Sequence, residues 1–497
     1  MRKYHKNLIL EIIQSMYQAG EQGDYAGCQD TALDLCDFID AQQSNTETVA
    51  LLTQYAEMCF KANEEEIGAK QLSRQLIKVE NSVNHELAVT KIEVVFFPYN
   101  LSMWDSLESI YLAAKSDPDC DVYVVPIPYY EWTPDRKLGK EYYHGDQYPD
   151  DVEITHYRDY DITARKPDLA FIHYEYDDMA NNATIAPDFY SKRLKEYCGK
   201  LIYVPYFFAT PNKPDDFWYT MPGVIHADKV ILPSDDHYQV ALKKSNQVTY
   251  LNKAIEDKYI SLGSPKLDKV LNSKETDFQL PEEWQVLMTK PDGTRKKIVL
   301  LNTHMFSLIE SGFYYFIKLK KLFDLFFHQP DLVLWWRPHP NTLLNIRLKA
   351  PFLLEEYITA LETVKNNKLG IVDETGDLHR ALYFSDAYYG HKSTVANLFS
   401  AKGCPVMIQP VRPKEHQNFT SDFPMSLEQM SSFMNCRYLE NEDVSVEAFL
   451  NYVVNIDQIQ EEKERAQKQK DCLQHYYKNS DGTAGIKIYK YVKELVV

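Results

Sequence analysis

The chain has 497 residues, of which 44% are hydrophobic and 25% charged, and its formal net charge is −18. This length exceeds one ordinary hydrophobic core and predicts two or three domains. The acidic balance argues against a nucleic-acid-binding protein, because neutralising phosphates requires a basic surface. It also disfavours adhesion of the whole surface to anionic lipid, although a local basic patch could still dock.

Sequence signals for membranes, export and metals are weak. No apolar run reaches the roughly 18–20 residues of a membrane-spanning helix. The basic N-terminus carries Glu11 and Gln14 within its apolar stretch, so we expect an amphipathic helix and not a signal peptide. The cysteines show no metal-binding spacing, and we interpret them as reduced thiols of a cytoplasmic protein. We expect no metal and no other cofactor.

Residues 1–88 predict an all-helical segment. Leu8, Ile12 and Met16 share one helical face, and similar spacing recurs in the two following stretches. The segment resembles helical-hairpin repeats of the tetratricopeptide kind, without a full repeat signature. We interpret it as a small helical bundle packed on the main body. The functional alternative is a docking module for a partner protein, an acceptor or a membrane surface.

From residue 90 onwards, apolar runs rich in Val, Ile and Phe alternate with helical stretches, which is typical of a parallel sheet covered on both faces. The pattern fills 89–275, pauses in a polar stretch at 272–297 that reads as a linker, and restarts within 276–455. We therefore predict an α/β protein with two Rossmann-like domains, the architecture called GT-B. The remaining segment, 456–497, predicts a charged helix that runs along the surface or crosses back to the first domain.

The first strong functional signal is the stretch 331–340 (DLVLWWRPHP), where an apolar run ends abruptly at Arg337 and His339. Such side chains fall at the carboxyl edge of a parallel sheet, where open α/β sheets bind ligands. Arg337 can hold a phosphate through paired N–H bonds. His339 can bond a phosphate or move a proton near neutral pH. The alternative is a strand end with a capping histidine.

The second signal lies in 385–409, where a strand is followed by His391, Lys392, Ser393 and Thr394 at the start of a helix. A helix N-terminus offers unpaired backbone N–H groups and the positive end of a dipole. Two adjacent cations there would repel each other unless an anion lies beside them. We therefore predict a phosphate or diphosphate site, with an activated nucleotide as its first ligand. Simple capping by Ser393 and Thr394 is the alternative.

Three further residues are candidates for the donor site. Asp377 precedes the second unit, and its carboxylate would touch a ribose or cap the next helix. Gly263 and Ser264 end the first domain and could place backbone N–H groups at the interdomain cleft. An ordinary turn between a strand and a helix is the alternative for this pair.

The first domain offers two candidate general bases, His173 and His226. His173 ends an apolar run, and Glu175 or Asp177 could assist it. A histidine whose nitrogens are satisfied within a loop is the alternative for both positions. Asp177 and Asp178 could bind a metal, but adjacent carboxylates without a third spaced ligand are a weak signal.

These residues resemble the CDP-glycerol glycerophosphotransferase family, the bacterial teichoic-acid poly(glycerol phosphate) polymerase group. The resemblance covers roughly 90–440 and is strongest over 331–409. The family's Arg/Lys-x-His-Pro element is matched by Arg337, His339 and Pro340. Its acidic-Leu, Ala-Asp, Ser-Ser and Lys-Pro elements are matched, with substitutions, by 377–378, 385–386, 390–394 and 403–405.

The chain departs from the family pattern in two places. The family's Thr-Asp-Tyr is replaced by residues 390–392 (GHK). Its Trp-His-Gly motif, whose histidine is thought to be the base, is replaced by residues 203–207 (YVPYF). Three alternatives follow from this second departure: His173 or His226 takes the role of the base, the chemistry differs, or activity is lost.

The resemblance implies a transferase that moves glycerol phosphate from CDP-glycerol to a hydroxyl of a polyol-phosphate or glycan acceptor of the cell wall or surface, with release of CMP. The C-terminal cations and hydroxyls named above would neutralise the leaving nucleotide, and His173 would activate the acceptor. It also implies a cytoplasmic protein at the inner face of the cell membrane. The alternatives are a GT-B glycosyltransferase or sugar-nucleotide epimerase that uses a UDP- or CMP-sugar, and a non-catalytic scaffold.

Overall fold

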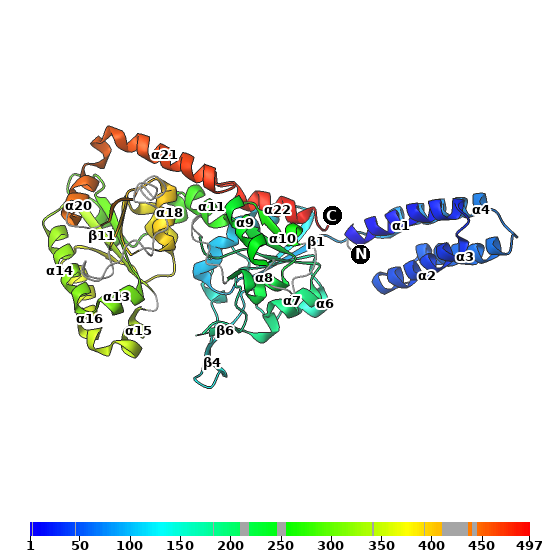
Figure 1. Cartoon of the computed structure of the whole chain (residues 1–497), viewed down its shortest axis with the longest axis horizontal. Coiled ribbons are helices and arrows are strands. Elements are labelled where there is room, and N and C mark those ends of the chain that lie inside the picture. Colours follow the sequence, from blue (N-terminus) through cyan, green and yellow to red (C-terminus); the bar gives the residue numbers. More distant parts are fainter. Residues whose placement is uncertain are drawn as a thin grey trace.

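The computed structural model describes residues 1–497 except for these positions: Arg2, Asn45, Asn182, 209–217, 246–254, 340–341, Lys392, 410–435 and 440–444. The chain forms a helical module, two α/β domains and a C-terminal helical segment that joins them (Figure 1). Within the described residues, no helix is long and apolar enough to cross a membrane.

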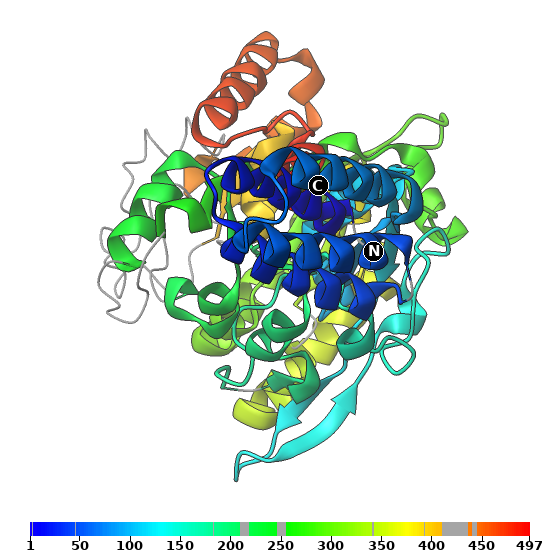
Figure 2. The same ribbon diagram turned by 90° about the vertical axis from the view of Figure 1, so that its right-hand side faces the viewer.

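The N-terminal module is all-helical, as the sequence predicts. Its helices are α1 (Lys3–Glu21), α2 (Tyr25–Gln42), α3 (Glu47–Asn63) and α4 (Ala69–Glu86). Side chains of Asp24 and Thr46 cap the starts of α2 and α3. The four helices enclose their own apolar core, which includes Ile13, Leu52 and Val79. The module projects from the body (Figure 1) and lies in front of it in Figure 2, so the predicted packing onto the main body is not observed.

The N-terminal domain is built on a six-stranded parallel sheet of order β2-β1-β5-β7-β8-β9. Its strands are β1 (Ile92–Phe97), β2 (Cys120–Val124), β5 (Leu169–Ile172), β7 (Lys200–Tyr203), β8 (Lys229–Leu232) and β9 (Tyr259–Ser261). All six residues of β1 are buried, because helices cover both faces of the sheet. A small antiparallel sheet of β3 (Tyr129–Trp132), β4 (Leu138–Tyr142) and β6 (Ala183–Ile185) extends from this domain (Figure 2).

The C-terminal domain has a second six-stranded parallel sheet, of order β12-β11-β10-β13-β14-β15. Its strands are β10 (Lys297–Thr303), β11 (Leu332–Pro338), β12 (Gly370–Val372), β13 (Ala387–Gly390), β14 (Val406–Ile408) and β15 (Cys436–Leu439). The main covering helices are α14 (Phe313–Phe327), α16 (Leu354–Asn366) and α18 (Thr394–Lys402). The predicted α/β architecture with two Rossmann-like domains is therefore confirmed.

The stretch interpreted as a linker is partly structured. It contains α12 (Glu282–Met288), whose Trp284 packs edge-to-face on Trp335 of β11 with ring centroids 5.3 Å apart. Met288 is buried in the same core. Although this stretch is polar overall, its two large apolar side chains, Trp284 and Met288, are sufficient to anchor one short helix on the C-terminal sheet.

Helices α11 (Pro265–Asn272), α21 (Gln460–Tyr476) and α22 (Ala484–Lys493) connect the two domains. Leu267 of α11 lies in the core of the C-terminal domain. Asp268 of the same helix accepts hydrogen bonds from the backbone N–H groups of Ala484 and Gly485 at the start of α22. Helix α22 packs against α5 (Glu108–Lys115), so the C-terminal segment crosses back to the N-terminal domain.

Gly263 allows this crossing segment to lie close to α11. It has a φ of +97°, and a Cβ atom at this position would overlap the carbonyl oxygen of Lys478. Its own N–H donates to the carbonyl of Leu232 at 3.1 Å. Gly263 therefore has a structural role in packing the C-terminal segment, and its N–H is not offered to a ligand as the sequence suggested.

Gly263→Ala is expected to destabilise the protein by roughly 1–3 kcal/mol more than Gly293→Ala, because only the first substitution adds overpacking. Gly293 has a φ of +82°, and a Cβ atom there would meet no other atom within 4 Å, so it reports the backbone strain alone. Denaturant unfolding of both variants measures the difference. Equal losses of stability would contradict the packing role of Gly263.

Candidate functional site

Both sheets contain a topological switch point, where the order of the strands reverses. It lies between β1 and β5 in the N-terminal domain and between β10 and β13 in the C-terminal domain. Open α/β sheets bind ligands outside the carboxyl ends of the strands at such points. His173 follows β5 and His391 follows β13, so the sequence analysis placed one candidate residue at each switch point.

His391 is buried, and its contacts fix its state. The backbone N–H of His304 donates to Nδ1 of His391 at 3.0 Å, which places the ring proton on Nε2. The ring of Tyr315 lies 5.5 Å away, centroid to centroid. Burial lowers the pKa of His391 to about 3, so the imidazole is neutral and is not the cation that the sequence suggested. Its neighbour Lys392 lies outside the described residues.

Nε2 of His391 is the notable atom of this group. It is buried, it carries a proton, and it has no hydrogen-bond partner among the described residues. An unpaired buried donor costs free energy, so such a group is expected to meet an acceptor in the working state.

A pair of imidazoles lies beside His391. The rings of His304 and His339 are edge-to-face with centroids 5.9 Å apart, and the N–H of His339 donates to the carbonyl of Thr303 at 3.2 Å. Burial lowers the pKa of both side chains. His304 thus contacts both His339 and His391, two residues that the sequence suggested for a phosphate site. His304 was missed, although it follows the apolar run of β10 just as His339 follows that of β11.

Ser393 and Thr394 begin α18 directly beside these imidazoles. Oγ of Ser393 accepts a hydrogen bond from the N–H of Ala396 at 3.4 Å and another from Nδ2 of Asn302 at 3.0 Å. Ser393 therefore caps the helix, and both hydroxyl residues are half-buried at the switch point. Asn302, at the end of β10, is a second site residue that the sequence analysis missed.

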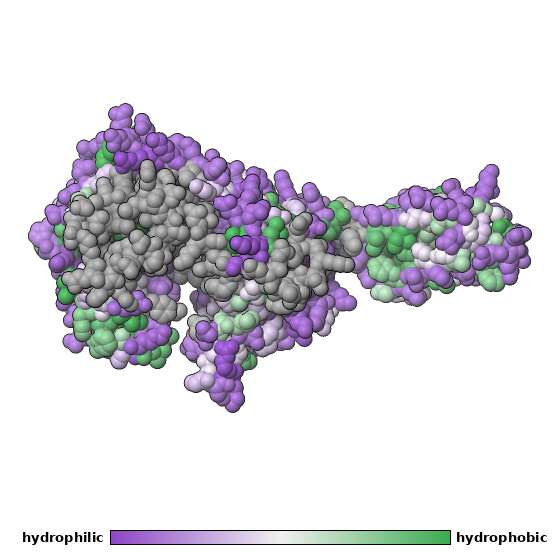
Figure 3. Space-filling model, viewed as in Figure 1, coloured by the Kyte–Doolittle hydropathy of each residue, from purple (hydrophilic) through white to green (hydrophobic). Residues whose placement is uncertain are grey.

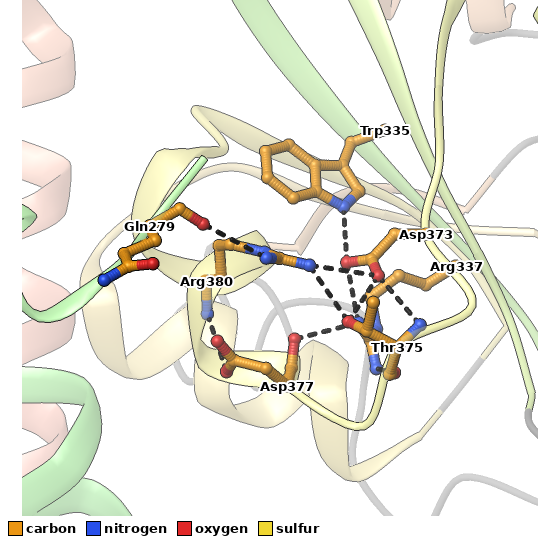
Figure 4. A network of polar contacts seen from close by, with 7 residues as sticks. All are labelled: Gln279, Trp335, Arg337, Asp373, Thr375, Asp377 and Arg380. Carbon is orange, nitrogen blue, oxygen red and sulfur yellow. Dashed lines mark hydrogen bonds and ion pairs between the residues drawn. The ribbon is translucent and has the colours of Figure 1, made fainter. Parts of the chain in front are cut away.

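Arg337 has a different environment from the one expected. Its guanidinium donates to the carboxylate of Asp373 at 2.7 Å and to the carbonyl oxygens of Thr375 and Asp377, both at 2.9 Å (Figure 4). These bonds fasten the loop after β12 to the end of β11. The contacts favour a positioning role over direct phosphate binding, because both terminal nitrogens already have acceptors.

Asp373 is the centre of the network in Figure 4. Its carboxylate also accepts hydrogen bonds from Nε1 of Trp335 at 3.0 Å and from the N–H of Thr375 at 3.0 Å, and Arg380 lies 3.5 Å away. Burial alone would raise the pKa of Asp373, but the charge of Arg337 and these donors lower it. The carboxylate is therefore ionised and holds the loop 373–380 in place.

Asp377 belongs to the same loop. Its carboxylate accepts a hydrogen bond from the N–H of Arg380 at 3.2 Å and caps α17 (Leu378–Phe384). Of the two roles considered for Asp377, capping is the one that the contacts support. Ser264 is buried at the start of α11 and makes no side-chain capping bond.

His173 has no accessible lone pair. Its Nε2 accepts from the N–H of Tyr99 at 2.8 Å, and its Nδ1 lies 3.0 Å from the hydroxyl of Ser106, which itself donates to the carbonyl of Met103. Burial and the charge of Lys266 lower the pKa of His173 to about 3. A general base needs an open nitrogen, so these contacts argue against His173 in that role. It joins the ends of β1 and β5 instead.

His226 lies at the end of the N-terminal sheet opposite the switch point. It ends α8 (Pro222–His226), and two residues later Asp228 binds the backbone N–H of Leu201 in β7. His226 and Asp228 directly precede β8, and Leu201 is the second residue of β7. His226 therefore lies at the amino edge of the sheet, opposite the switch point. Burial and nearby lysines lower its pKa. The prediction that His226 acts as the base is not supported by this placement.

Glu175 is a buried carboxyl group near the N-terminal switch point. It is fully buried two residues beyond His173, and its Oε2 accepts from the hydroxyl of Tyr203 at 3.1 Å. Oε1 has no hydrogen-bond partner among the described residues. Burial raises the pKa of Glu175 to about 7, where a carboxyl group can take up or release a proton at neutral pH. Asp177 differs, since both its oxygens accept bonds from Ser191.

A buried ionic cluster joins the two domains at the carboxyl edges of both sheets. Asp105, which follows β1, bonds Nζ of Lys266 in α11 through one oxygen and Nε2 of His379 in α17 through the other, at 2.7 Å. All three side chains are buried. Burial opposes ionisation, but Lys266 and His379 hold the pKa of Asp105 well below its ordinary value. We call this group the interdomain latch.

Asp105→Asn is expected to lower the free energy of unfolding by roughly 3–5 kcal/mol, because it leaves Lys266 buried without a carboxylate. Since the pKa of Asp105 is depressed in the folded state, its stabilisation is present at neutral pH and is lost only as the pH falls through that low value. Denaturant unfolding at pH 7 measures the loss.

Asp135→Asn is the matched control, because Asp135 pairs with Lys137 at 2.7 Å on the open surface. Its unfolding midpoint is expected to match that of the wild type. A latch variant that unfolds with the same midpoint as this control would contradict the role of Asp105.

The comparisons with known proteins bear on the fold. No protein-family model matches the sequence, and no curated protein matches it by sequence. A solved structure described as a putative UDP-N-acetylglucosamine 2-epimerase from Listeria monocytogenes is 14% identical, with a TM-score of 0.50 over 82% of this chain and 97% of that chain. A variant of the wall teichoic acid polymerase TagF is 13% identical, with a TM-score of 0.49 over 90% and 97% of the two chains. The Listeria likeness, together with the two parallel sheets, shows that the chain has the GT-B fold.

Proposed function

We propose that this protein is an enzyme that binds a nucleotide-activated donor at the carboxyl edge of its C-terminal sheet and transfers the activated group to an acceptor hydroxyl. The observation that carries the proposal is the start of α18 at the switch point, where His391 keeps an unpaired N–H beside half-buried Ser393 and Thr394. The positive end of the helix and these donors suit a diphosphate.

CDP-glycerol is the donor we propose first, because His339, Ser393 and Thr394, three residues that carry the family resemblance, follow strands β11 and β13 at this edge of the sheet. His304 contacts both His339 and His391 there. In the proposed reaction, the acceptor oxygen attacks the β-phosphorus of the donor, the bond from that phosphorus to the CMP oxygen breaks, and CMP leaves. The donors at α18 would stabilise the charge that develops on CMP. The acceptor class is a polyol phosphate or a glycan.

Glu175 is the group we propose to accept the proton of the acceptor hydroxyl. The family's Trp-His-Gly motif is absent, and the contacts of His173 and His226 leave neither suited to the task. A carboxyl group with a pKa of about 7 can replace a histidine in this role. The same replacement favours a sugar-nucleotide enzyme as the second candidate, since a carboxylate of this basicity could also take a proton from a sugar.

Ser393→Ala is expected to weaken the thermal stabilisation that CDP-glycerol gives the protein. A ligand at 100 times its dissociation constant adds about 2.7 kcal/mol to the stability of the wild type. The variant loses a hydroxyl at the site and a helix cap of about 1 kcal/mol. Thermal unfolding with and without CDP-glycerol, CMP, CDP and UDP- or CMP-sugars measures both effects.

Ser445→Ala provides a matched control for this experiment. Ser445 caps α20 (Val446–Val454) by accepting a hydrogen bond from Ala448 at 3.2 Å, so its loss costs a similar cap away from the site. The control should keep the full ligand shift. A shift only with UDP- or CMP-sugars would select the second candidate, and no shift with any nucleotide would favour a non-catalytic scaffold.

Glu175→Gln is expected to lower kcat by about 100-fold or more while leaving the dissociation constant of the donor unchanged, because only proton transfer is lost. The wild-type rate should rise with pH and level off above about 7, where the carboxylate forms. A variant that keeps its kcat and the same pH profile would exclude Glu175 as the base.

The pH dependence of the unfolding free energy of Glu175→Gln tests the raised pKa of Glu175 independently of activity. The folded protein binds the proton of Glu175 more tightly than the unfolded chain does, since the pKa is raised to about 7. This group therefore stabilises the fold below the unfolded pKa of about 4.3, and the contribution is lost as the pH rises through 7. Glu175→Gln should remove that loss in unfolding experiments between these two pH values.

A further inference from the structure

Helices α2 and α3 form an open groove in the N-terminal module that projects from the body. The two helices pack against each other side by side (Figure 1). The groove between them has a volume of about 320 Å³, and its lining includes Gln29 and Leu33 of α2 and Thr53, Phe60 and Lys61 of α3. Figure 3 shows apolar surface next to hydrophilic surface on this module.

Two large apolar side chains of the groove remain exposed. Leu33 is 45% exposed and Phe60 is 53% exposed. Other apolar residues of the same helices, including Leu35 and Leu52, are buried in the core of the module. Exposed apolar residues that are scattered singly are ordinary, but Leu33 and Phe60 come from different helices and line one cavity. The groove is therefore apolar at its centre.

Acidic side chains flank the apolar residue of each helix. Asp30 and Asp37 lie about one turn before and after Leu33 on α2, and all three are exposed. Glu57 and Glu64 take the corresponding places around the apolar residue of α3, and both are exposed. The groove therefore has carboxylates along both of its sides.

Negative charge is concentrated in this part of the chain. Residues 25–66 contain nine acidic residues and one basic residue, so they carry a net charge of −8 out of −18 for the whole chain. The one basic residue, Lys61, is in the last turn of α3, where it suits the negative end of the helix dipole. Helix α4 packs on α1 and α3, and its basic residues do not line the groove: Lys70, Arg74 and Lys78.

We propose that the groove of α2 and α3 binds a basic amphipathic helix of a partner protein. The apolar side of that helix lies on Leu33 and Phe60, and its lysines and arginines meet the flanking carboxylates. Charge complementarity selects this occupant, because a two-fold pairing of grooves from two copies of the chain would bring acidic side chains against each other. Of the docking roles that the sequence left open for residues 1–88, the groove selects a partner protein. The inference does not rest on the proposed reaction, since it uses none of the site residues.

The test is the fluorescence anisotropy of a labelled peptide of about 18 residues, made of leucine and lysine in the pattern of an amphipathic helix, titrated with the full chain. The wild type should bind it at least about tenfold more tightly than a scrambled peptide of the same composition, and added salt should weaken binding. The double variant Leu33→Asp with Phe60→Asp should bind about 100-fold more weakly, because each lost apolar contact costs roughly tenfold. Asp37→Lys with Glu57→Lys should bind at least about tenfold more weakly, because each reversed charge replaces an attraction with a repulsion.

Each pair of groove substitutions has a matched control. Ile77→Asp changes an apolar side chain that is 51% exposed on α4, outside the groove. Glu11→Lys with Glu283→Lys changes the net charge as much as the groove pair does, at exposed positions on α1 and α12. Both controls should bind the peptide as the wild type does. Thermal unfolding of all the variants should match that of the wild type, since substitutions at exposed positions change stability little.

Three results would overturn the proposal. The first is a wild type that binds the scrambled peptide as tightly as the patterned one, since charge alone would then explain binding. The second is a control variant that loses as much affinity as the corresponding groove variant, which would place binding outside the groove. The third is a wild type that self-associates in sedimentation velocity and a Leu33→Asp with Phe60→Asp variant that does not, since the groove would then join two copies of the chain.

Discussion

The geometry of this protein depends on a buried ion group at the junction of its domains. Asp105 comes from the N-terminal domain, His379 from the C-terminal domain and Lys266 from the helix between them. A buried carboxylate costs several kcal/mol unless its partners are in place. The latch therefore defines one relative placement of the carboxyl edges of the two sheets, and the proposed donor and acceptor sites lie along those edges.

The two switch points then receive different chemistry from the same architecture. In the C-terminal domain, the loop held by Arg337 and Asp373 positions His379, while the imidazoles and α18 line the neighbouring strands. In the N-terminal domain, burial raises the pKa of Glu175 to about 7, although the hydrogen bond from the hydroxyl of Tyr203 opposes this rise. In the function proposed above, one edge supplies hydrogen-bond donors to an anion and the other supplies a proton acceptor, the two kinds of group that a transfer reaction needs.

Much of the fold could be predicted from the sequence, because parallel strands that are buried on both faces read as continuous apolar runs. The position of His391 at the carboxyl edge of the sheet followed from the same pattern, and the cap at Ser393 was the alternative considered to an anion site. The environment of Arg337 could not be predicted, since its partner Asp373 lies 36 residues further along the chain. The interdomain latch could not be predicted either, because Asp105 and His379 are separated by 274 residues. Glu175 was noted only as a helper, because its raised pKa depends on burial that spacing does not report.

The most direct test of the central claim is a crystal structure of the full chain with CDP-glycerol or CDP. The account predicts that the diphosphate lies at the start of α18, within hydrogen-bond distance of Nε2 of His391 and of the hydroxyls of Ser393 and Thr394. A nucleotide bound elsewhere, or a structure in which His391 keeps Nε2 buried and unpaired beside an occupied site, would contradict it.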